Sequence, residues 1–184
     1  WLSYGVHGDE ISSTDAGLSL AYHLLAAQDD PIVSIILKDT IVIIDPVQNP
    51  DGRERFIQSF ESSLGLEPLS DRYSAEHDQP WPGGRFNHYL FDLNRDWFAV
   101  SQPETRGKIK AVLEWNPVVV VDAHEMDGDE TYFFAPAAKP FNPGITDEQR
   151  EKQFILGKNH ADWFDKYGIE YFTREIFDQF YPGY

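Results

Sequence analysis

Short apolar runs rich in β-branched residues recur along the chain and predict the strands of a buried sheet. A short continuous apolar run is typical of a strand that is covered on both faces. On this basis we expect strands at 1–6, 40–44, 117–122 and 170–173. Asp45-Pro46 and then Asn49-Pro50-Asp51-Gly52 follow the second run, and residues of these types favour turns.

The spacing of apolar residues after the first run predicts a helix through Ala27. Its candidate N-caps are the hydroxyl residues Ser12, Ser13 and Thr14. The positions at helical spacing that would form its buried face are Leu18, Ala21, Tyr22 and Leu25. Pro31 is expected to end this region.

Two later helices carry signals at their ends. Pro103 suits the first position of a helix through Trp115. Thr146 and Gln149 form a predicted capping box for a helix that ends at 167–168. Residues 61–84 lack periodicity, which predicts a long loop of the kind that often carries function. The alternation of strands and helices predicts one α/β domain with a mixed, mainly parallel sheet and helices on both faces.

Composition narrows the function classes. The chain has 15 Lys and Arg against 31 Asp and Glu, a formal net charge of -16, which argues against nucleic acid as a partner. The absence of Cys excludes disulfides and thiolate metal ligands, so any metal must use His and carboxylates. No apolar run approaches the roughly 18 residues that a membrane span needs.

Polar residues capable of metal chemistry follow the predicted strands, where sites form in α/β sheets. His7 and Glu10 follow the first strand at a spacing that lets both reach one ion, and His124 follows a later strand. Two His and one Glu are the ligand set of a catalytic zinc with an open position for water. Taken alone, the spacing is also compatible with solvated loop residues, and the shared position after strands favours the metal.

A second group of residues suits the recognition of anions. Arg95 beside Asn94 could bind a carboxylate with two parallel hydrogen bonds, and Arg85 could stabilise a developing oxyanion. Asp92 could accept the free N–H of a ligand histidine. Each of these is also compatible with ordinary loop polarity.

These motifs, in this order, resemble the zinc carboxypeptidases of the carboxypeptidase A type. The order is His7-x-x-Glu10, Asn49-Pro50-Asp51-Gly52, Arg85, Asp92-Leu93-Asn94-Arg95, His124 and a tyrosine-rich end. The resemblance implies one zinc ion held by His7, Glu10 and His124, with Asp92 behind His7. It also implies that Arg85 steadies the scissile carbonyl and that Asn94 and Arg95 hold the substrate carboxylate.

The end of the chain resembles the loop whose tyrosine closes over substrate. Tyr181 is favoured for that catalytic position, and Tyr184 is the alternative, as a substrate-binding residue. The longer signatures resemble a bacterial branch of the family, and they lie at 81–85, 94–98 and 122–126. By resemblance, the general-base Glu follows the tyrosine, so we expect it beyond Tyr184 and the domain to be partial.

The function expected from the resemblance is zinc-dependent removal of C-terminal amino acids from peptides that end in a free carboxylate. One alternative is a zinc-dependent deacylase of N-acyl amino acids, which would recognise a carboxylate too. Another is a non-catalytic zinc- or peptide-binding fragment, which the expected lack of the general base favours. A periplasmic or secreted location is suggested by the resemblance alone.

Overall fold

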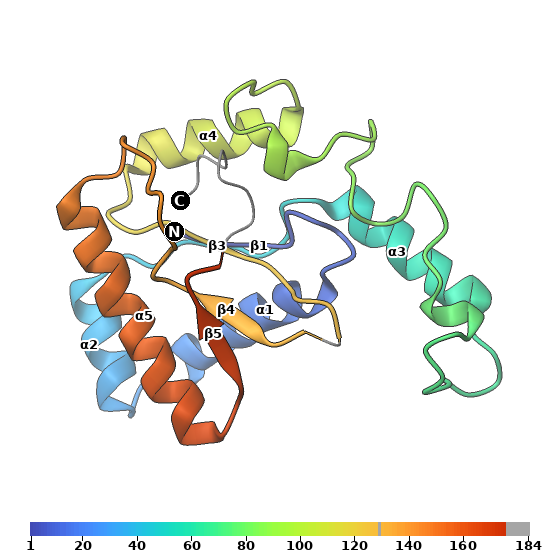
Figure 1. Cartoon of the computed structure of the whole chain (residues 1–184), viewed down its shortest axis with the longest axis horizontal. Coiled ribbons are helices and arrows are strands. Elements are labelled where there is room, and N and C mark those ends of the chain that lie inside the picture. The colour runs from blue at the N-terminus through green and yellow to red at the C-terminus, as the bar shows by residue number, and fades with distance from the viewer. Residues whose placement is uncertain (129, 176–184) are drawn as a thin grey trace. The chain divides into compact units, whose positions relative to one another are not determined.

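The computed structural model describes residues 1–128 and 130–175, and these form two compact units. The first unit is Trp1–Glu125 and the second is Met126–Tyr184. Figure 1 labels their helices and strands along the chain. Every residue with a proposed role in metal or carboxylate binding that the structure describes belongs to the first unit.

The first unit is built on a three-stranded parallel sheet in the order β2-β1-β3. β1 is Leu2–Tyr4, β2 is Ile44–Asp45 and β3 is Val121–Ala123. Leu2 pairs with Ile44 on one side and with Val121 on the other. The predicted α/β class with a parallel sheet is therefore confirmed. The strands are shorter than predicted, because only residues that pair with a neighbouring strand belong to a strand. In β1 this pairing begins at Leu2, opposite Val121.

Helix α1 spans Ile11–Ala26, and its start differs from the prediction. Glu10 occupies the N-cap position without a capping side-chain hydrogen bond, so none of the predicted hydroxyl caps is correct. The hydroxyl of Ser13 instead accepts from the backbone N–H of Gly5 (3.1 Å) and donates to the carbonyl of Glu10 (2.9 Å). These bonds tie the helix to the loop that follows β1.

The buried side of α1 also differs from the predicted apolar face. Leu18, Tyr22 and Leu25 are exposed, whereas Gly17 and Leu24 are buried. The reason is that Gly17 faces the ring of Tyr4 in β1, so the helix approaches the sheet at its smallest residue. The spacing of apolar residues alone could not reveal that the helix packs against the sheet at Gly17.

Two helices were not predicted, and both begin at a proline. They are α2, Pro31–Asp39, and α3, Pro50–Ser63. Asp30 and Asn49 cap them by accepting hydrogen bonds from backbone N–H groups of the first turn. The Asn-Pro-Asp-Gly motif is thus a helix start and not only a turn, because an Asx residue before proline also satisfies the N-cap and N1 positions.

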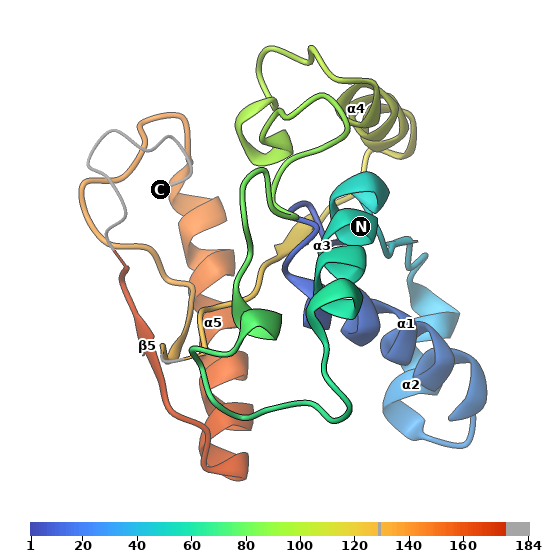
Figure 2. The same cartoon turned by 90° about the vertical axis from the view of Figure 1, so that its right-hand side faces the viewer.

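The remaining elements of the first unit are α4 and two short 3-10 helices. Helix α4 spans Pro103–Trp115, as predicted. The 3-10 helices are η1, Ala75–His77, and η2, Leu93–Arg95. Most of 61–84 is loop, although α3 extends to Ser63. In Figure 2, that loop leaves the lower end of α3, rises beside the helix and leads upward toward α4.

The second unit pairs β4, Tyr132–Phe134, with β5, Tyr171–Thr173, in parallel. Helix α5, Asp147–Tyr167, connects them, and both its capping box at Thr146 and its C-terminal Gly168 are as predicted. The ring of Phe134 lies 5.1 Å from Phe164 and 4.9 Å from Tyr171, so aromatic packing joins helix to strands. The strand β4 was not predicted.

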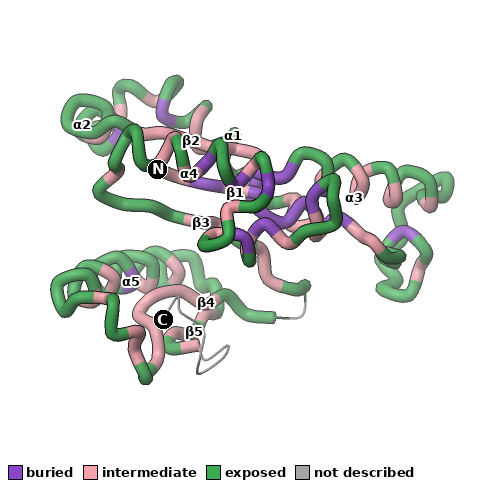
Figure 3. Tube along the Cα trace, turned by 90° about the horizontal axis from the view of Figure 1, so that it is seen from above, coloured by how far each residue is buried: buried purple, intermediate pink, exposed green. Residues whose placement is uncertain are grey.

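The interior of the first unit is polar around the ends of its strands. Residues 5–8, directly after β1, are buried (Figure 3). The buried polar side chains of the described residues include His7, Gln48, Asn49 and Lys108. Buried polar groups need partners, so this concentration points to a site where the strands end.

None of the helices that the structure describes is both long enough and apolar enough to cross a bilayer.

Candidate metal centre

The two neighbouring strands β1 and β3 bring the predicted metal ligands together. His7 and Glu10 lie in the turn between β1 and α1, and His124 follows β3 directly. Parallel strands end at the same edge of a sheet, so residues far apart in sequence converge there. One ligand atom from each of the three residues lies within 4.8 Å of those of the other two.

The two imidazoles present the same nitrogen to Glu10. His7 Nδ1 lies 2.5 Å from Glu10 Oε1, and His124 Nδ1 lies 3.1 Å from Glu10 Oε2. The ring centroids of the two histidines are 5.1 Å apart. Two neutral imidazole nitrogens and one carboxylate suit zinc, and three protein ligands leave a position open. The residues present therefore fit a zinc ion.

The electrostatics of this cluster favour a cation. Burial raises the pKa of Glu10, but hydrogen bonds from His124 and His7 outweigh burial and hold its pKa at about 2. Burial lowers the pKa of His124, but Asp122 and Glu10 outweigh it and raise that pKa to about 9. When no metal is bound, protonated His124 therefore supplies positive charge beside the carboxylates of Glu10 and Asp122.

Asp92 lies behind His7, where a carboxylate partner was predicted. Its Oδ1 is 3.2 Å from His7 Nε2 and accepts from the backbone N–H of Asn94 at 2.9 Å. Its Oδ2 accepts from Arg85 Nε (3.0 Å) and Nη2 (2.8 Å). Burial opposes ionisation of Asp92, but His7 and Arg85 outweigh it and lower its pKa. An ionised Asp92 turns His7 so that Nδ1 faces Glu10.

Asp122, for which no role was predicted, takes the corresponding place behind His124. Asp122 Oδ2 lies 3.5 Å from His124 Nε2. The signal was available in the sequence, because residues two apart at the end of a strand lie on the same face. Each histidine therefore has a carboxylate on the side away from Glu10.

Arg85 reaches the centre from the long loop, and its backbone is fixed by two other motifs. The Asn49 side chain donates to the carbonyl of Arg85 (3.1 Å), and the N–H of Gly8 donates to the carbonyl of Gly84 (3.0 Å). Arg85 Nη1 lies 3.5 Å from His7 Nδ1. The guanidinium is thus held beside the cluster by Asp92 and aimed at it.

Close backbone approach explains two glycines in these motifs. A Cβ on Gly52 would collide with the carbonyl oxygen of Gly84, and a Cβ on Gly8 would collide with the backbone at 52–53. Arg55, one turn into α3, donates to the carbonyls of Gly83, Phe86 and Asn87. The start of α3 thereby fixes both the His7–Glu10 turn and the loop that carries Arg85.

The residues predicted to bind a carboxylate lie on η2. Asn94 Nδ2 is 3.4 Å from His124 Nε2, which places this amide at the cluster. Arg95 is exposed, and its Nη1 donates to the carbonyl of Asn94 at 3.3 Å. The structure brings Asn94 to the metal cluster and leaves Arg95 at the surface beside it.

Other candidate residues are placed differently. The carboxylate of Glu125, the residue after His124, accepts hydrogen bonds from the backbone N–H (2.8 Å) and the hydroxyl of Ser12. Tyr181 and Tyr184 lie outside the described residues. Their predicted roles over the substrate therefore stay predictions.

Comparisons with known proteins show what the chain is similar to. The zinc carboxypeptidase family model matches residues 1–152. Carboxypeptidase D of Mus musculus and carboxypeptidase D of Rattus norvegicus are each 29% identical to the chain over 138 residues. That alignment covers 74% of this chain and 9% of each relative, so the chain spans about a tenth of their length. No solved structure matches the chain significantly. Because the family match covers most of its residues, the chain belongs to the zinc carboxypeptidase family.

Proposed function

We propose that the protein containing this chain is a zinc-dependent metallocarboxypeptidase that removes C-terminal amino acids from peptides. The observation that carries the proposal is the convergence of His7 Nδ1 and His124 Nδ1 on the carboxylate of Glu10. Arg85 beside that cluster and the neighbouring Asn94–Arg95 pair support it. We extend the proposal to the bacterial branch of the family on the signatures at 81–85, 94–98 and 122–126, although both curated relatives are mammalian.

In this proposal His7, Glu10 and His124 hold one zinc ion. Zinc supplies an acidified water and polarises a carbonyl oxygen when bound. The Arg85 guanidinium lies within reach of the cluster and stabilises negative charge that develops on the substrate oxygen. Asp92 orients both Arg85 and His7, which couples the positions of these two groups.

Asn94 and Arg95 select a substrate with a free carboxylate. When His124 carries its proton on Nε2 and directs it to Asp122, the nearby amide hydrogen of Asn94 remains available to an acceptor. The planar fork of Arg95 suits a carboxylate better than a point charge would. Tyr181, or alternatively Tyr184, covers the bound substrate.

Substrate panels on the intact protein test this function. We expect cleavage of peptides with a free C-terminus, weak activity on the same peptides with a C-terminal amide, and weak activity on N-acyl amino acids. Arg95→Ala should mainly reduce the preference for the free acid over the amide. Faster turnover of N-acyl amino acids would favour the deacylase instead, and zinc binding without turnover of either class would favour a binding module.

The metal is tested separately by elemental analysis of the purified protein. We expect one zinc per chain and loss of that zinc in a His7→Ala/His124→Ala double variant. Stoichiometric zinc in the double variant would show that the ion is held elsewhere.

A further inference from the structure

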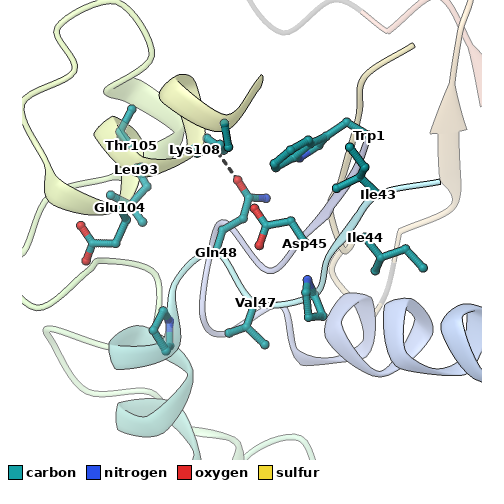
Figure 4. Close-up of a pocket in the computed structure, with 14 residues that line it drawn as sticks. Trp1, Ile43, Ile44, Asp45, Val47, Gln48, Leu93, Glu104, Thr105 and Lys108 are labelled. Atoms are coloured by element: carbon teal, nitrogen blue, oxygen red, sulfur yellow. Dashed lines mark hydrogen bonds between the residues drawn. The ribbon is translucent and has the colours of Figure 1, made fainter. Parts of the chain in front are cut away.

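Lys108 is a buried cation to which none of the roles described so far belongs. Lys108 in α4 is only 8% exposed. Its Nζ donates to Gln48 Oε1 at 2.7 Å and lies 3.8 Å from the centroid of the Trp97 ring. Figure 4 shows Lys108 reaching from α4 to the side chain of Gln48, in the wall of a pocket of about 490 Å³.

Gln48 connects this cation to the metal cluster. The side chain is 7% exposed, and its Nε2 donates to Asp122 Oδ1 at 2.9 Å. The other oxygen of Asp122, Oδ2, faces His124 Nε2. The opposite nitrogen of that imidazole, Nδ1, faces Glu10. An unbroken path of polar contacts therefore runs from Lys108 through Gln48 and Asp122 to His124.

The charges at the two ends of Gln48 determine which way its amide points. An ammonium group only donates and an ionised carboxylate only accepts, so the amide oxygen must face Lys108 and the amide nitrogen must face Asp122. A flipped amide would direct its oxygen at the carboxylate and its N–H groups at the ammonium. Both contacts would be repulsive, which leaves one orientation.

We propose that Lys108 and Gln48 are positioning residues of the metal centre, which act through Asp122 to hold His124 with Nδ1 toward the ion. The proposal rests on the metal site of the proposed function. Lys108 fixes the amide of Gln48, Gln48 fixes the carboxylate of Asp122, and Asp122 fixes the histidine ring and its proton.

A role in packing alone does not account for Lys108. A buried ammonium is costly, and an apolar side chain of similar length would fill the same space over Trp97 without that cost. Asp122, Asp45 and Asp96 attract the ammonium, but its Nζ donates at 2.7 Å to the neutral amide of Gln48. The position of the charge is therefore explained by what it does to Gln48.

The zinc affinity of the intact, metal-free protein tests the proposal, measured by competition with a chelator of known affinity. Loss of a carboxylate or its partner behind a ligand histidine typically weakens metal binding by about 10–100-fold. We expect Lys108→Met and Gln48→Met each to weaken zinc binding by roughly tenfold, the low end of that range. The double variant should be no weaker than either single one, because both residues act through one path.

The direction in which Lys108→Met changes the zinc affinity distinguishes a positioning role from simple electrostatic repulsion. Removing a cation near a zinc site strengthens zinc binding if only Coulomb repulsion matters, whereas loss of positioning weakens it. Lys110→Met is the matched control, since it removes the same charge from an exposed position of the same helix and should not weaken binding. Thermal unfolding of each metal-free variant shows whether it is folded. If the Lys108→Met variant is unfolded, the zinc affinity of the Gln48→Met variant, which removes no charge, tests the proposal instead.

The outcomes distinguish this inference from the function on which it rests. If the unaltered protein binds zinc and both Met variants bind it equally well or more tightly, the positioning role is wrong and the metal site stands. If the unaltered protein binds no zinc, the metal site itself is wrong, and the positioning role is overturned with it.

Discussion

At the residue scale, the two candidate ligand histidines are related by orientation as well as by proximity. Each turns Nδ1 toward Glu10 and Nε2 toward a carboxylate, Asp92 for His7 and Asp122 for His124. A neutral imidazole must carry its proton on one nitrogen to ligate through the other. The carboxylates therefore select the tautomer that zinc requires.

The same contacts couple zinc uptake to proton release. The pKa of His124 is raised to about 9 because Asp122 and Glu10 outweigh the effect of burial, so without metal this histidine is protonated near neutral pH. Zinc must displace that proton, and zinc affinity should rise with pH until the pH passes the pKa of His124. Titration calorimetry in buffers of different ionisation enthalpy measures the number of protons released. Uptake near neutral pH with no proton release would contradict the prediction.

What the sequence could reveal at this scale was which residues converge, not how they are turned. His7, Glu10 and His124 were named because all three follow strands. The contact of Lys108 with Gln48 joins residues 60 positions apart and depends on the placement of α4, which no local pattern encodes. Buried partners of this kind become visible only when side chains are placed.

At the element scale, the start of α3 organises the first unit. Its N-cap, Asn49, is fully buried and holds both the first turn of the helix and the backbone of Arg85. Gly52 lies where α3 meets the loop that carries Arg85, with no room for a side chain. The Asn49-Pro50-Asp51-Gly52 motif therefore joins α3 to the loop that carries Arg85 and to the turn after β1, which it meets at Gly8.

Gly52→Ala should destabilise the protein. The added Cβ meets the backbone carbonyls of Gly84 and Phe86, and backbone yields less readily than a side chain. Overpacking of this kind typically costs about 1–3 kcal/mol of the free energy of unfolding, measurable by denaturant titration. Gly107→Ala in α4 is the control, because its Cβ meets nothing within 4 Å, and it should stabilise the helix by about 0.5–1 kcal/mol. Equal stability of the two variants would argue against the close approach.

The elements that the sequence predicted well are those whose signals are local. Pro103 for α4 and the Thr146–Gln149 capping box for α5 identify helix starts from neighbouring residues alone. The helices α2 and α3 were missed because Asp30-Pro31 and Asn49-Pro50 are equally good turns and helix starts. Whether such a pair forms a turn or starts a helix depends on the contacts that the residues after it make.

At the scale of the whole molecule, the described metal-binding residues are confined to one of the two compact units. All three candidate zinc ligands and their carboxylate partners lie within Trp1–Glu125. A ligand that binds only the folded state stabilises it by an amount set by its concentration relative to its dissociation constant. Bound zinc should therefore stabilise the folded state of this unit directly.

Hydrogen exchange checks this expectation. With zinc at about 100 times its dissociation constant, the added stability is about 2.7 kcal/mol, and the amides of β1, β3 and the first turn of α1 should exchange more slowly. The His7→Ala/His124→Ala variant is the control and should show no change on addition of zinc. Unchanged protection in the unaltered protein, despite bound zinc, would mean that the ion is held away from these strands.

The wide separation of the ligands in sequence gives a bound ion the character of a covalent cross-link. Glu10 and His124 are 114 residues apart, so an ion that bridges them closes a loop of that length, and closing such a loop restricts the unfolded chain by on the order of 4–5 kcal/mol. Within that loop, residues 64–73 are exposed throughout. A protease that nicked the chain there would leave the ligands on two polypeptides, which the ion would still tie together.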